Sequence, residues 1–285
     1  MKKILTAALL GLSLNSFADN APLWLRFSAI SPDGQTIAFS YKGDIFSVPV
    51  NGGTAKQLTT NSAYDAYPVW SPDGQKIAFA STREGSMDVY LMDKNGGVPK
   101  RLTTNSGNET PMAFTDNSHV LFTSAGMPTA KSIFFASGTF PQTYEVGIDA
   151  SRPRLYSPMT MYDVSIRSNG DILYHDAKGY EDNFRKHHRS PVTRDIWLYS
   201  KGNYTKLTDF NGEDRTPVWA GNDNAYYYLS EEDGTFNVYK RNIDGSGKKQ
   251  LTFHKKNPVR FLTVANNGTL CYGYDGEIYT LKEGE

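Results

Sequence analysis

The amino-acid sequence predicts an all-β fold, a six-bladed β-propeller built from four-stranded antiparallel blades. One observation behind this prediction is a unit of four short strands that returns along the chain and is clearest between Tyr67 and Thr103. Another is a Leu-Thr pair that ends each unit, at Leu58-Thr59, Leu102-Thr103, Leu207-Thr208 and Leu251-Thr252. These pairs are 44, 105 and 44 residues apart, and a period of about forty residues is typical of propeller blades. A two-sheet sandwich, the alternative all-β fold, gives no reason for one unit to return at a fixed period.

The clearest unit also shows why its residues form a meander of strands. Ser71-Pro72-Asp73-Gly74 makes a tight turn, since Pro72 fixes φ at the second turn position and Gly74 tolerates a positive φ. The runs on either side, such as Lys76–Ala80 and Asp88–Met92, contain the Val, Ile, Phe and Tyr residues that strands favour. One sheet of this size leaves an apolar face in water, so the units are expected to stack against each other around a ring.

Six units follow in order along the chain. Their first turns are Ser31-Pro32-Asp33-Gly34, Ser71-Pro72-Asp73-Gly74, Thr115-Asp116-Asn117, Ser168-Asn169-Gly170, Gly221-Asn222-Asp223 and Asn266-Asn267-Gly268. Their third strands are expected at Asp44–Val48, Asp88–Met92, Ser132–Ala136, Asp195–Tyr199, Asn237–Lys240 and Glu277–Leu281. Gln142–Val146 follows Leu102 by one period and is expected to be the degenerate last strand of the third unit. The extra residues of the longest spacing are assigned mainly to Lys178–Arg194, a long connection between the second and third strands of the fourth unit.

The sixth unit has three of its four strands. Its Leu-Thr strand would fall beyond Glu285, and the equivalent position near the other end of the chain falls within residues 1–18. The last blade is therefore expected to lack its outer strand, and the natural chain is expected to continue.

Residues 1–18 are predicted to be a secretory signal peptide, and residues 19–285 to be the propeller domain. The segment starts with Lys2 and Lys3, continues with the apolar run Ile4–Leu14, and ends in Ser16-Phe17-Ala18, which suits signal peptidase. The apolar run is too short to span a membrane as a helix. These features predict an exported protein, periplasmic in a bacterium and soluble after removal of the signal.

Charge and cysteine content limit the possible partners. The formal net charge is zero, which argues against a nucleic-acid partner because phosphate binding needs an excess of Lys and Arg. Cys271 is the only cysteine, so the chain cannot form an internal disulfide.

Three groups of residues have both a structural and a functional interpretation. Trp70 and Trp219 stand at matching positions of first strands, where packing between blades is the preferred explanation over cofactor binding. Tyr226-Tyr227-Tyr228 is interpreted as a second strand rather than a binding motif. Asn242–Gly245 is similar to a calcium loop, but it stands where other units have Asn-Gly-Gly, so a hairpin turn is preferred.

The Ser-Pro-Asp-Gly turns, Ile-Ala-Phe second strands and Leu-Thr endings resemble the propellers of TolB and of tricorn-like peptidases. The opening Pro22–Arg26 and the stretch Asp176–Tyr199, which contains Glu181-Asp182 and Arg185–His188, strengthen the resemblance to exported bacterial tricorn-like peptidases. The absence of a preceding α/β domain points the same way. The resemblance covers the whole predicted mature chain and implies a non-catalytic, six-bladed propeller at the N-terminus of a serine peptidase.

This resemblance implies that the propeller screens or docks oligopeptides for a protease core in later domains. No catalytic residue is assigned here, because the sequence has no Gly-x-Ser-x-Gly, His-Glu-x-x-His or glycine-rich phosphate loop. No cofactor or metal is expected, since His187 and His188 would point to opposite faces of an extended chain. The alternatives are a free-standing TolB-like scaffold that binds a protein partner and, more remotely, a lyase acting on acidic sugars through a His-bound metal.

Two groups of residues are candidates for binding a peptide or partner. Three carboxylates that stand just before first strands are expected to gather at the channel mouth and attract cationic peptides, namely Asp65, Glu109 and Asp214. Each could instead cap its own loop. Five basic residues of the long connection are expected to contact the following domains or the carboxylate end of a peptide, namely Arg185, Lys186, His187, His188 and Arg189. The alternative is a loop folded onto its own blade, with Glu181 or Asp182 paired to Arg185 or Arg189.

Overall fold

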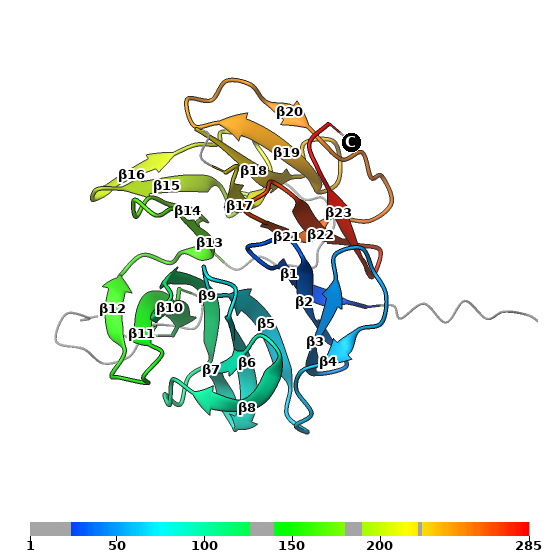
Figure 1. Ribbon diagram of the computed structural model, residues 1–285. Helices are drawn as coiled ribbons and strands as arrows, with labels where there is room; N and C mark the ends of the chain where they lie inside the picture. The colour runs from blue at the N-terminus through cyan, green and yellow to red at the C-terminus, as the bar shows by residue number, and fades with distance from the viewer. Residues whose placement is uncertain (1–23, 126–139, 180–189, 222–223, 285) are drawn as a thin grey trace, which may run out of the picture.

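The computed structural model describes residues 24–125, 140–179, 190–221 and 224–284, and within these ranges the regular structure consists of β-strands alone. Six antiparallel sheets stand around a central axis, which confirms the predicted six-bladed propeller (Figure 1). In each sheet the strands follow one another in chain order, as a meander requires.

The first three blades are each four-stranded. Blade 1 contains β1 (Arg26–Ile30), β2 (Thr36–Tyr41), β3 (Asp44–Pro49) and β4 (Lys56–Gln57). Blade 2 contains β5 (Asp65–Trp70), β6 (Lys76–Glu84), β7 (Ser86–Asp93) and β8 (Gly96–Arg101). Blade 3 contains β9 (Glu109–Asp116), β10 (His119–Ser124), β11 (Gln142–Gly147) and β12 (Arg154–Ser157).

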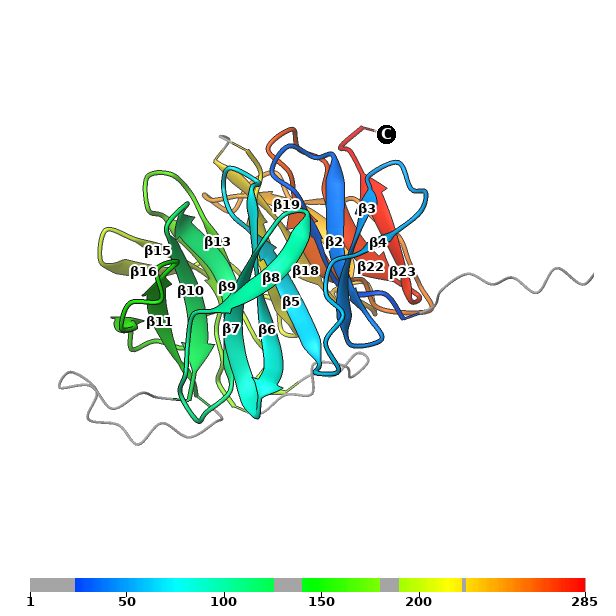
Figure 2. The ribbon, with the colours of Figure 1, turned by 60° about the horizontal axis from the view of Figure 1, so that its bottom comes forward.

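Of the remaining blades, the last has three strands in the described part of the chain. Blade 4 contains β13 (Tyr162–Ile166), β14 (Ile172–His175), β15 (Ile196–Ser200) and β16 (Asn203–Lys206). Blade 5 contains β17 (Asp214–Trp219), β18 (Ala225–Ser230), β19 (Asn237–Asn242) and β20 (Lys249–Gln250). Blade 6 contains β21 (Arg260–Val264), β22 (Leu270–Tyr274) and β23 (Glu277–Leu281), as expected from the sequence. Figure 2 shows the blades standing side by side, with blade 2 between blades 1 and 3.

Blade 3 differs from the prediction. Gln142–Val146 belongs to β11, which pairs with β10 on one side and with β12 on the other, so it is the third strand and not the last. The segment expected to form the third strand, Ser132–Ala136, lies outside the described residues. The prediction was wrong because it placed the extra residues in blade 4 alone, whereas long connections separate β10 from β11 and also β14 from β15.

The Leu-Thr endings have a structural reason that the repeat itself does not reveal. The hydroxyl oxygens of four equivalent threonines accept a hydrogen bond from a backbone N–H of their own blade's third strand, at 2.8 to 3.0 Å; the threonines are Thr59, Thr103, Thr208 and Thr252. In blade 5, Thr252 also donates to Asn237 Oδ1 at 2.9 Å. Each threonine therefore joins the segment after the outer strand to the start of the third strand inside a buried site.

The Thr252→Val variant is expected to unfold more easily than the natural chain by about 1 to 3 kcal/mol, because the buried Val238 N–H loses its acceptor. Valine has nearly the shape of threonine, so the change isolates the hydroxyl. Thermal and urea unfolding measure the difference, and Thr252→Ser, which keeps a hydroxyl, is the control. Equal unfolding of all three proteins would show that the hydroxyl contributes little.

The two matching tryptophans join neighbouring blades, as predicted. Trp70 Nε1 donates to Ala29 O at 2.9 Å, and Trp219 Nε1 donates to Ser165 O at 3.0 Å. Each indole thus crosses from the first strand of its blade to the first strand of the blade before it. Tyr226-Tyr227-Tyr228 lies within β18 and is buried, which confirms that these residues form a second strand.

The ring closes between blades 6 and 1 without a shared sheet in the described residues. Ile30 and Ile37 of blade 1 pack with Ala265 and Cys271 of blade 6 in one buried cluster. Several hydrogen bonds cross the same seam, among them Leu25 N to Gly276 O, Asn266 N to Pro32 O, and Ile30 N to Thr263 Oγ1, at 2.9, 2.9 and 3.1 Å. Side-chain packing and a few hydrogen bonds therefore close the propeller at this seam.

Candidate functional site

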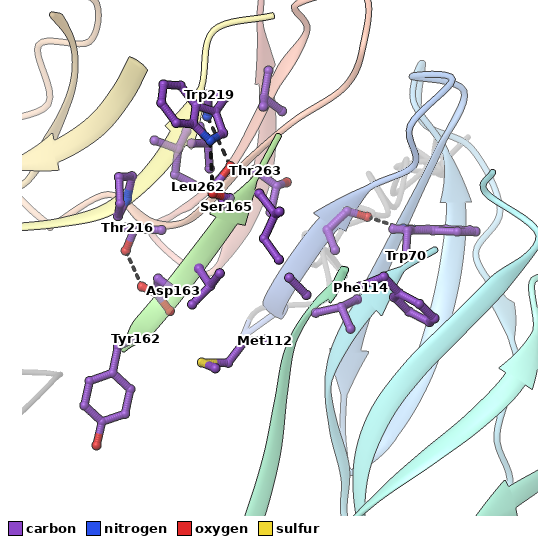
Figure 3. A pocket seen from close by; sticks show the side chains of 18 of the residues that line it. Trp70, Met112, Phe114, Tyr162, Asp163, Ser165, Thr216, Trp219, Leu262 and Thr263 are labelled. Carbon is purple, nitrogen blue, oxygen red and sulfur yellow. Dashed lines mark hydrogen bonds between the residues drawn. The ribbon is translucent and has the colours of Figure 1, made fainter. Parts of the chain in front are cut away.

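The central channel forms a cavity with a volume of about 1530 Å³. The first strands of all six blades line it, namely β1, β5, β9, β13, β17 and β21. Figure 3 shows side chains from several of these strands pointing into the channel. The channel is therefore the place where every blade contributes to one surface.

A repeated backbone distortion occurs in the strands that line this channel. In five blades the first strand contains a β-bulge and a residue with positive φ, between 47° and 57°, that stands four or five residues before the first turn. These residues are Phe27, Tyr67, Asp163, Thr216 and Phe261, and blade 3 has Pro111 at the equivalent place. We call these six residues the waist. A positive φ is unfavourable for aromatic and β-branched residues, by about 1 to 3 kcal/mol each, and such strain gathers at functional sites.

One half of the waist is aromatic. The ring of Phe27 lies 4.0 Å from that of Tyr67 and 4.9 Å from that of Phe261, measured between ring centroids. The three rings come from blades 1, 2 and 6, which are neighbours in the ring of sheets. This half can pack against an apolar side chain or an aromatic group of a ligand.

The other half of the waist is polar. Thr216 Oγ1 donates to Asp163 Oδ2 at 2.6 Å (Figure 3). The Thr216 backbone N–H donates to His175 Nδ1 at 3.3 Å. Burial, together with the charges of Arg194 and Arg215, holds the pKa of His175 well below its ordinary value, so the imidazole is neutral. A neutral ring with Nδ1 as acceptor carries its proton on Nε2. Asp163 keeps its side chain 48% exposed toward the channel.

Three arginines stand beside this polar half. Arg194 precedes β15, Arg215 precedes Thr216 in β17, and Arg260 precedes Phe261 in β21; all three line the channel. Arg215 lies over the ring of Phe236 at 3.9 Å, which shields one of its faces from water. Arg194 and Arg215 both approach Glu213 Oε1, at 3.6 and 3.5 Å.

The three predicted carboxylates lie elsewhere. Asp65, Glu109 and Asp214 begin β5, β9 and β17, are at most 2% exposed, and do not line the channel. Asp65 pairs with Arg83 of its own blade at 2.7 Å. The structure therefore does not bring the three to the channel mouth, and a binding role for them stays a prediction.

Burial changes the protonation of two of these carboxylates. Burial, with a smaller contribution from the nearby Asp88 carboxylate, raises the pKa of Glu109 to about 7. Burial also raises the pKa of Asp214 to about 7, with a smaller contribution from Asp195. Both groups therefore titrate near neutral pH at the junctions between blades.

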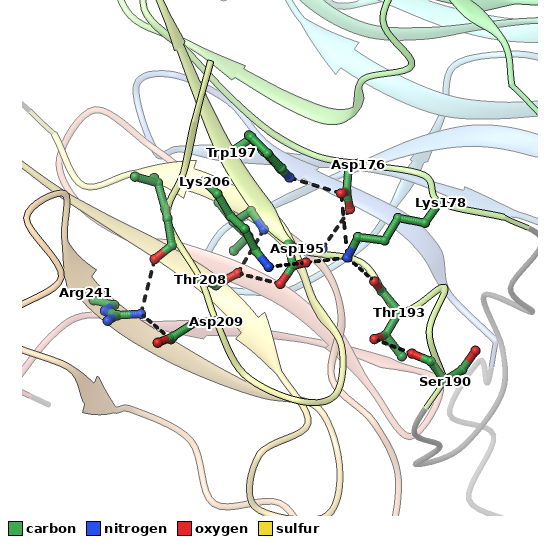
Figure 4. Close-up of polar contacts among 12 residues, drawn as sticks. Asp176, Lys178, Ser190, Thr193, Asp195, Trp197, Lys206, Thr208, Asp209 and Arg241 are labelled. Carbon is green, nitrogen blue, oxygen red and sulfur yellow. Dashed lines mark hydrogen bonds and ion pairs between the residues drawn. The ribbon is translucent and has the colours of Figure 1, made fainter. Parts of the chain in front are cut away.

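The five predicted basic residues, Arg185, Lys186, His187, His188 and Arg189, lie outside the described residues. The described ends of their connection are fixed to blade 4 (Figure 4). Lys178 Nζ donates to Thr193 O at 2.6 Å and pairs with the buried Asp195, which Lys206 also approaches at 2.9 Å. This network holds Thr193 and Asp195, the two neighbours of Arg194, in place.

The waist is the part of the site that sequence reasoning missed. Its members share no single residue type, but aligning the first turns of the six blades would have placed them within one position of each other, because all stand four or five residues before a turn. Within the described ranges, no three His, Cys, Asp or Glu side chains form a group that could hold a metal ion. Asn242–Gly245 forms the predicted hairpin turn, with Gly245 N donating to Asn242 O at 2.9 Å.

Comparison with known proteins gives consistent results. A family model described as the tricorn protease N-terminal beta propeller domain matches residues 22–285. Tricorn protease homolog 1 of Streptomyces coelicolor is 27% identical over 271 residues, which cover 92% of this chain and 24% of that protein. This chain thus spans about a quarter of the length of that relative.

Solved structures show the same fold. The crystal structure of the tricorn protease superposes with a TM-score of 0.75 at 20% identity, over 92% of this chain and 25% of that one. TolB from Acinetobacter baumannii superposes with a TM-score of 0.61 at 20% identity, over 84% of this chain and 56% of that one. In the ranges that the structure describes, no helix has the length and hydropathy needed to cross a bilayer.

Proposed function

The chain belongs to the tricorn protease N-terminal β-propeller family, and from this premise we propose that it docks or screens oligopeptides for a protease core elsewhere in a longer protein. The proteolytic step itself is assigned to that core and to no residue of this chain. Export to the periplasm, directed by residues 1–18 as a signal peptide, is part of the same proposal.

The two-sided waist is the observation that carries this proposal. An extended peptide advances by about 3.3 Å per residue and turns successive side chains to opposite sides. A channel with aromatic rings on one side and Asp163, Thr216 and arginines on the other can contact both sets of side chains together. The cavity of about 1530 Å³ has room for several residues of such a peptide.

The long connection of blade 4 enters the proposal as a contact to later domains. Its ends are fixed by the Lys178 and Asp195 network, so the basic residues 185–189 are attached to a defined place on the propeller. We assign to them the role of binding the following domains or a peptide carboxylate.

The Phe27→Gly variant is expected to bind a random heptapeptide pool at least about tenfold more weakly while the propeller stays folded. Glycine accepts the φ of 52° at this position without strain, so the change removes the ring and relieves the backbone. Isothermal titration calorimetry measures the binding, and thermal unfolding checks the fold. The control is Phe253→Ala, which removes an aromatic ring that is 67% exposed and outside the channel. Binding that is equal in all three proteins would contradict a role for the waist.

A TolB-like scaffold that binds a folded partner is the second candidate function. It is favoured by an apolar surface at the junction of blades 3 and 4, where Phe140, Met159 and Tyr204 are 42% to 45% exposed around a cavity of about 320 Å³. Absence of any binding of the peptide pool to the natural chain would favour this candidate over the first.

A further inference from the structure

We infer that the channel selects peptides with acidic side chains, and that Arg194, Arg215 and Arg260 bind the side-chain carboxylates. This inference deepens the proposed function and rests on it. It names the chemical class of peptide that the polar half of the waist accepts.

The three guanidinium groups are close together on one part of the channel wall. Arg194 and Arg215 are 8% and 6% exposed, and both line the channel. The small exposed part of each side chain therefore opens into the channel. Burial first, and then the charges of Arg260 and Arg194, lower the pKa of Arg215 to about 10. Each guanidinium therefore lies within the electrostatic influence of the next, and an anion among them relieves this repulsion.

The carboxylates that accompany these arginines are buried behind the channel wall. Glu213 and Glu231 are 1% and 0% exposed and do not line the channel. Asp163 is the one carboxylate that lines the waist among the described residues, and its Oδ2 already accepts a hydrogen bond from Thr216. A ligand at the waist consequently meets these three guanidinium groups and the Asp163 carboxylate, which is already hydrogen-bonded to Thr216.

The ion pair with Glu213 does not use all the hydrogen-bond donors of Arg194. Its Nη1 lies 3.6 Å from Glu213 Oε1, which is longer than the roughly 2.8 Å of a good charge-assisted hydrogen bond. Its Nε is buried and has no hydrogen-bond partner within the described part of the chain. A guanidinium group offers planar N–H donors to carboxylate oxygens, and a peptide Asp or Glu can supply these oxygens at the part of Arg194 that opens into the channel.

This selectivity is opposite in sign to the one expected from the sequence. The carboxylates that were expected to attract cationic peptides, Asp65, Glu109 and Asp214, do not line the channel. The arginines, which did not stand out in the sequence, do. The charge that a passing peptide meets is therefore positive on the polar side of the waist.

The test uses three heptapeptides, acetylated and amidated at their ends, that differ only in a central Glu, Gln or Lys. Calorimetric titration at low salt is expected to show the Glu peptide binding about tenfold more tightly than the Gln peptide, with the Lys peptide weakest. Raising the salt concentration should reduce the differences. In Arg194→Gln the ratio between Glu and Gln peptides should fall toward one. Arg154→Gln, which changes a 72% exposed arginine on β12, is the matched control and should keep the ratio.

Two failures can be told apart. If none of the three peptides binds, the proposed peptide function fails and this inference fails with it. If all three bind equally, the peptide function stands and the inference is overturned. Should Arg194→Gln unfold, Arg260→Gln decides in its place, because Arg260 also lines the channel and is partly exposed. A preference for the Glu peptide that survives this change also overturns the inference.

Discussion

The Arg215→Met variant is expected to lose about 3 kcal/mol of stability, because it leaves a buried carboxylate without one of the cations that approach it. Glu213 is 1% exposed and is approached by Arg215 at 3.5 Å and Arg194 at 3.6 Å. Arg194 stays in place, so the loss lies near the lower end for a broken buried pair. Methionine keeps packing against Phe236, over whose ring Arg215 lies at 3.9 Å. In a domain of this size the melting temperature should fall by roughly 6 to 12 °C.

A double-mutant cycle separates the ion pair from the packing. Glu213→Gln alone should also destabilise the propeller, since two buried arginines then share no carboxylate at that place. The double variant Arg215→Met with Glu213→Gln should be more stable than the sum of the single changes predicts. Urea unfolding of the four proteins measures the coupling free energy, and additive single changes would contradict the pair.

The stability of the propeller is expected to fall as the pH rises from about 4.5 to about 7. Burial raises the pKa of Glu109 and of Asp214 to about 7 in the folded chain. Between the unfolded and folded pKa values the folded chain holds more protons than the unfolded chain, so stability decreases with rising pH. The stabilising contribution of these protons is complete below about pH 4 and is lost as the pH passes 7.

The Glu109→Gln variant resembles the protonated side chain at every pH. At pH 8 it is expected to be more stable than the natural chain by on the order of 2 kcal/mol, after allowance for solvent screening. The new amide can donate to the Asp88 carboxylate, which is buried beside Glu109. Unfolding curves at pH 5, 6, 7 and 8 measure the effect. The control is Glu84→Gln, an exposed change in blade 2, whose pH dependence should match that of the natural chain.

The blade count was predictable because its signals are local. The Ser-Pro-Asp-Gly turn forms hydrogen bonds among its own residues. Ser71 Oγ donates to Asp73 Oδ1 at 2.6 Å, and Gly74 N donates to Ser71 O at 2.8 Å. The Leu-Thr ending is equally self-contained, because its threonine bonds within its own blade. Short-range hydrogen bonds of this kind require particular residue types, and these residue types are visible in a sequence.

The position of the inserted residues was not predictable in the same way. A spacing between two Leu-Thr pairs gives the total excess of residues and not its place. Blade 3 has no such pair, so Gln142–Val146 could be read as a third or a fourth strand. Pairing between strands that are distant in the chain decided the matter, and the repeat carries no information about it.

The positions of the waist residues and of the three carboxylates could not be predicted from the sequence for a second reason. The bulge between Ala66 and Val69 interrupts the alternation of side chains along β5. Asp65 is therefore buried beside Arg83 while Tyr67 lines the channel, although they are two positions apart and a regular strand would turn both to one face. The bulge depends on the ring of six first strands as a whole. The residue types found at it range from Phe to Thr, so they do not identify it in a sequence.

The seam between blades 6 and 1 links the width of the channel to the stability of the ring. Phe27 belongs to blade 1 and Phe261 to blade 6, and their rings, 4.9 Å apart, meet across the place where no sheet is shared in the described residues. A small separation of these two blades increases that distance directly, whereas the other blades can keep their spacing. A ligand seated between the two rings would consequently slow amide hydrogen exchange at Leu25 and Ile30, whose N–H groups donate across the seam, because it holds the two blades together.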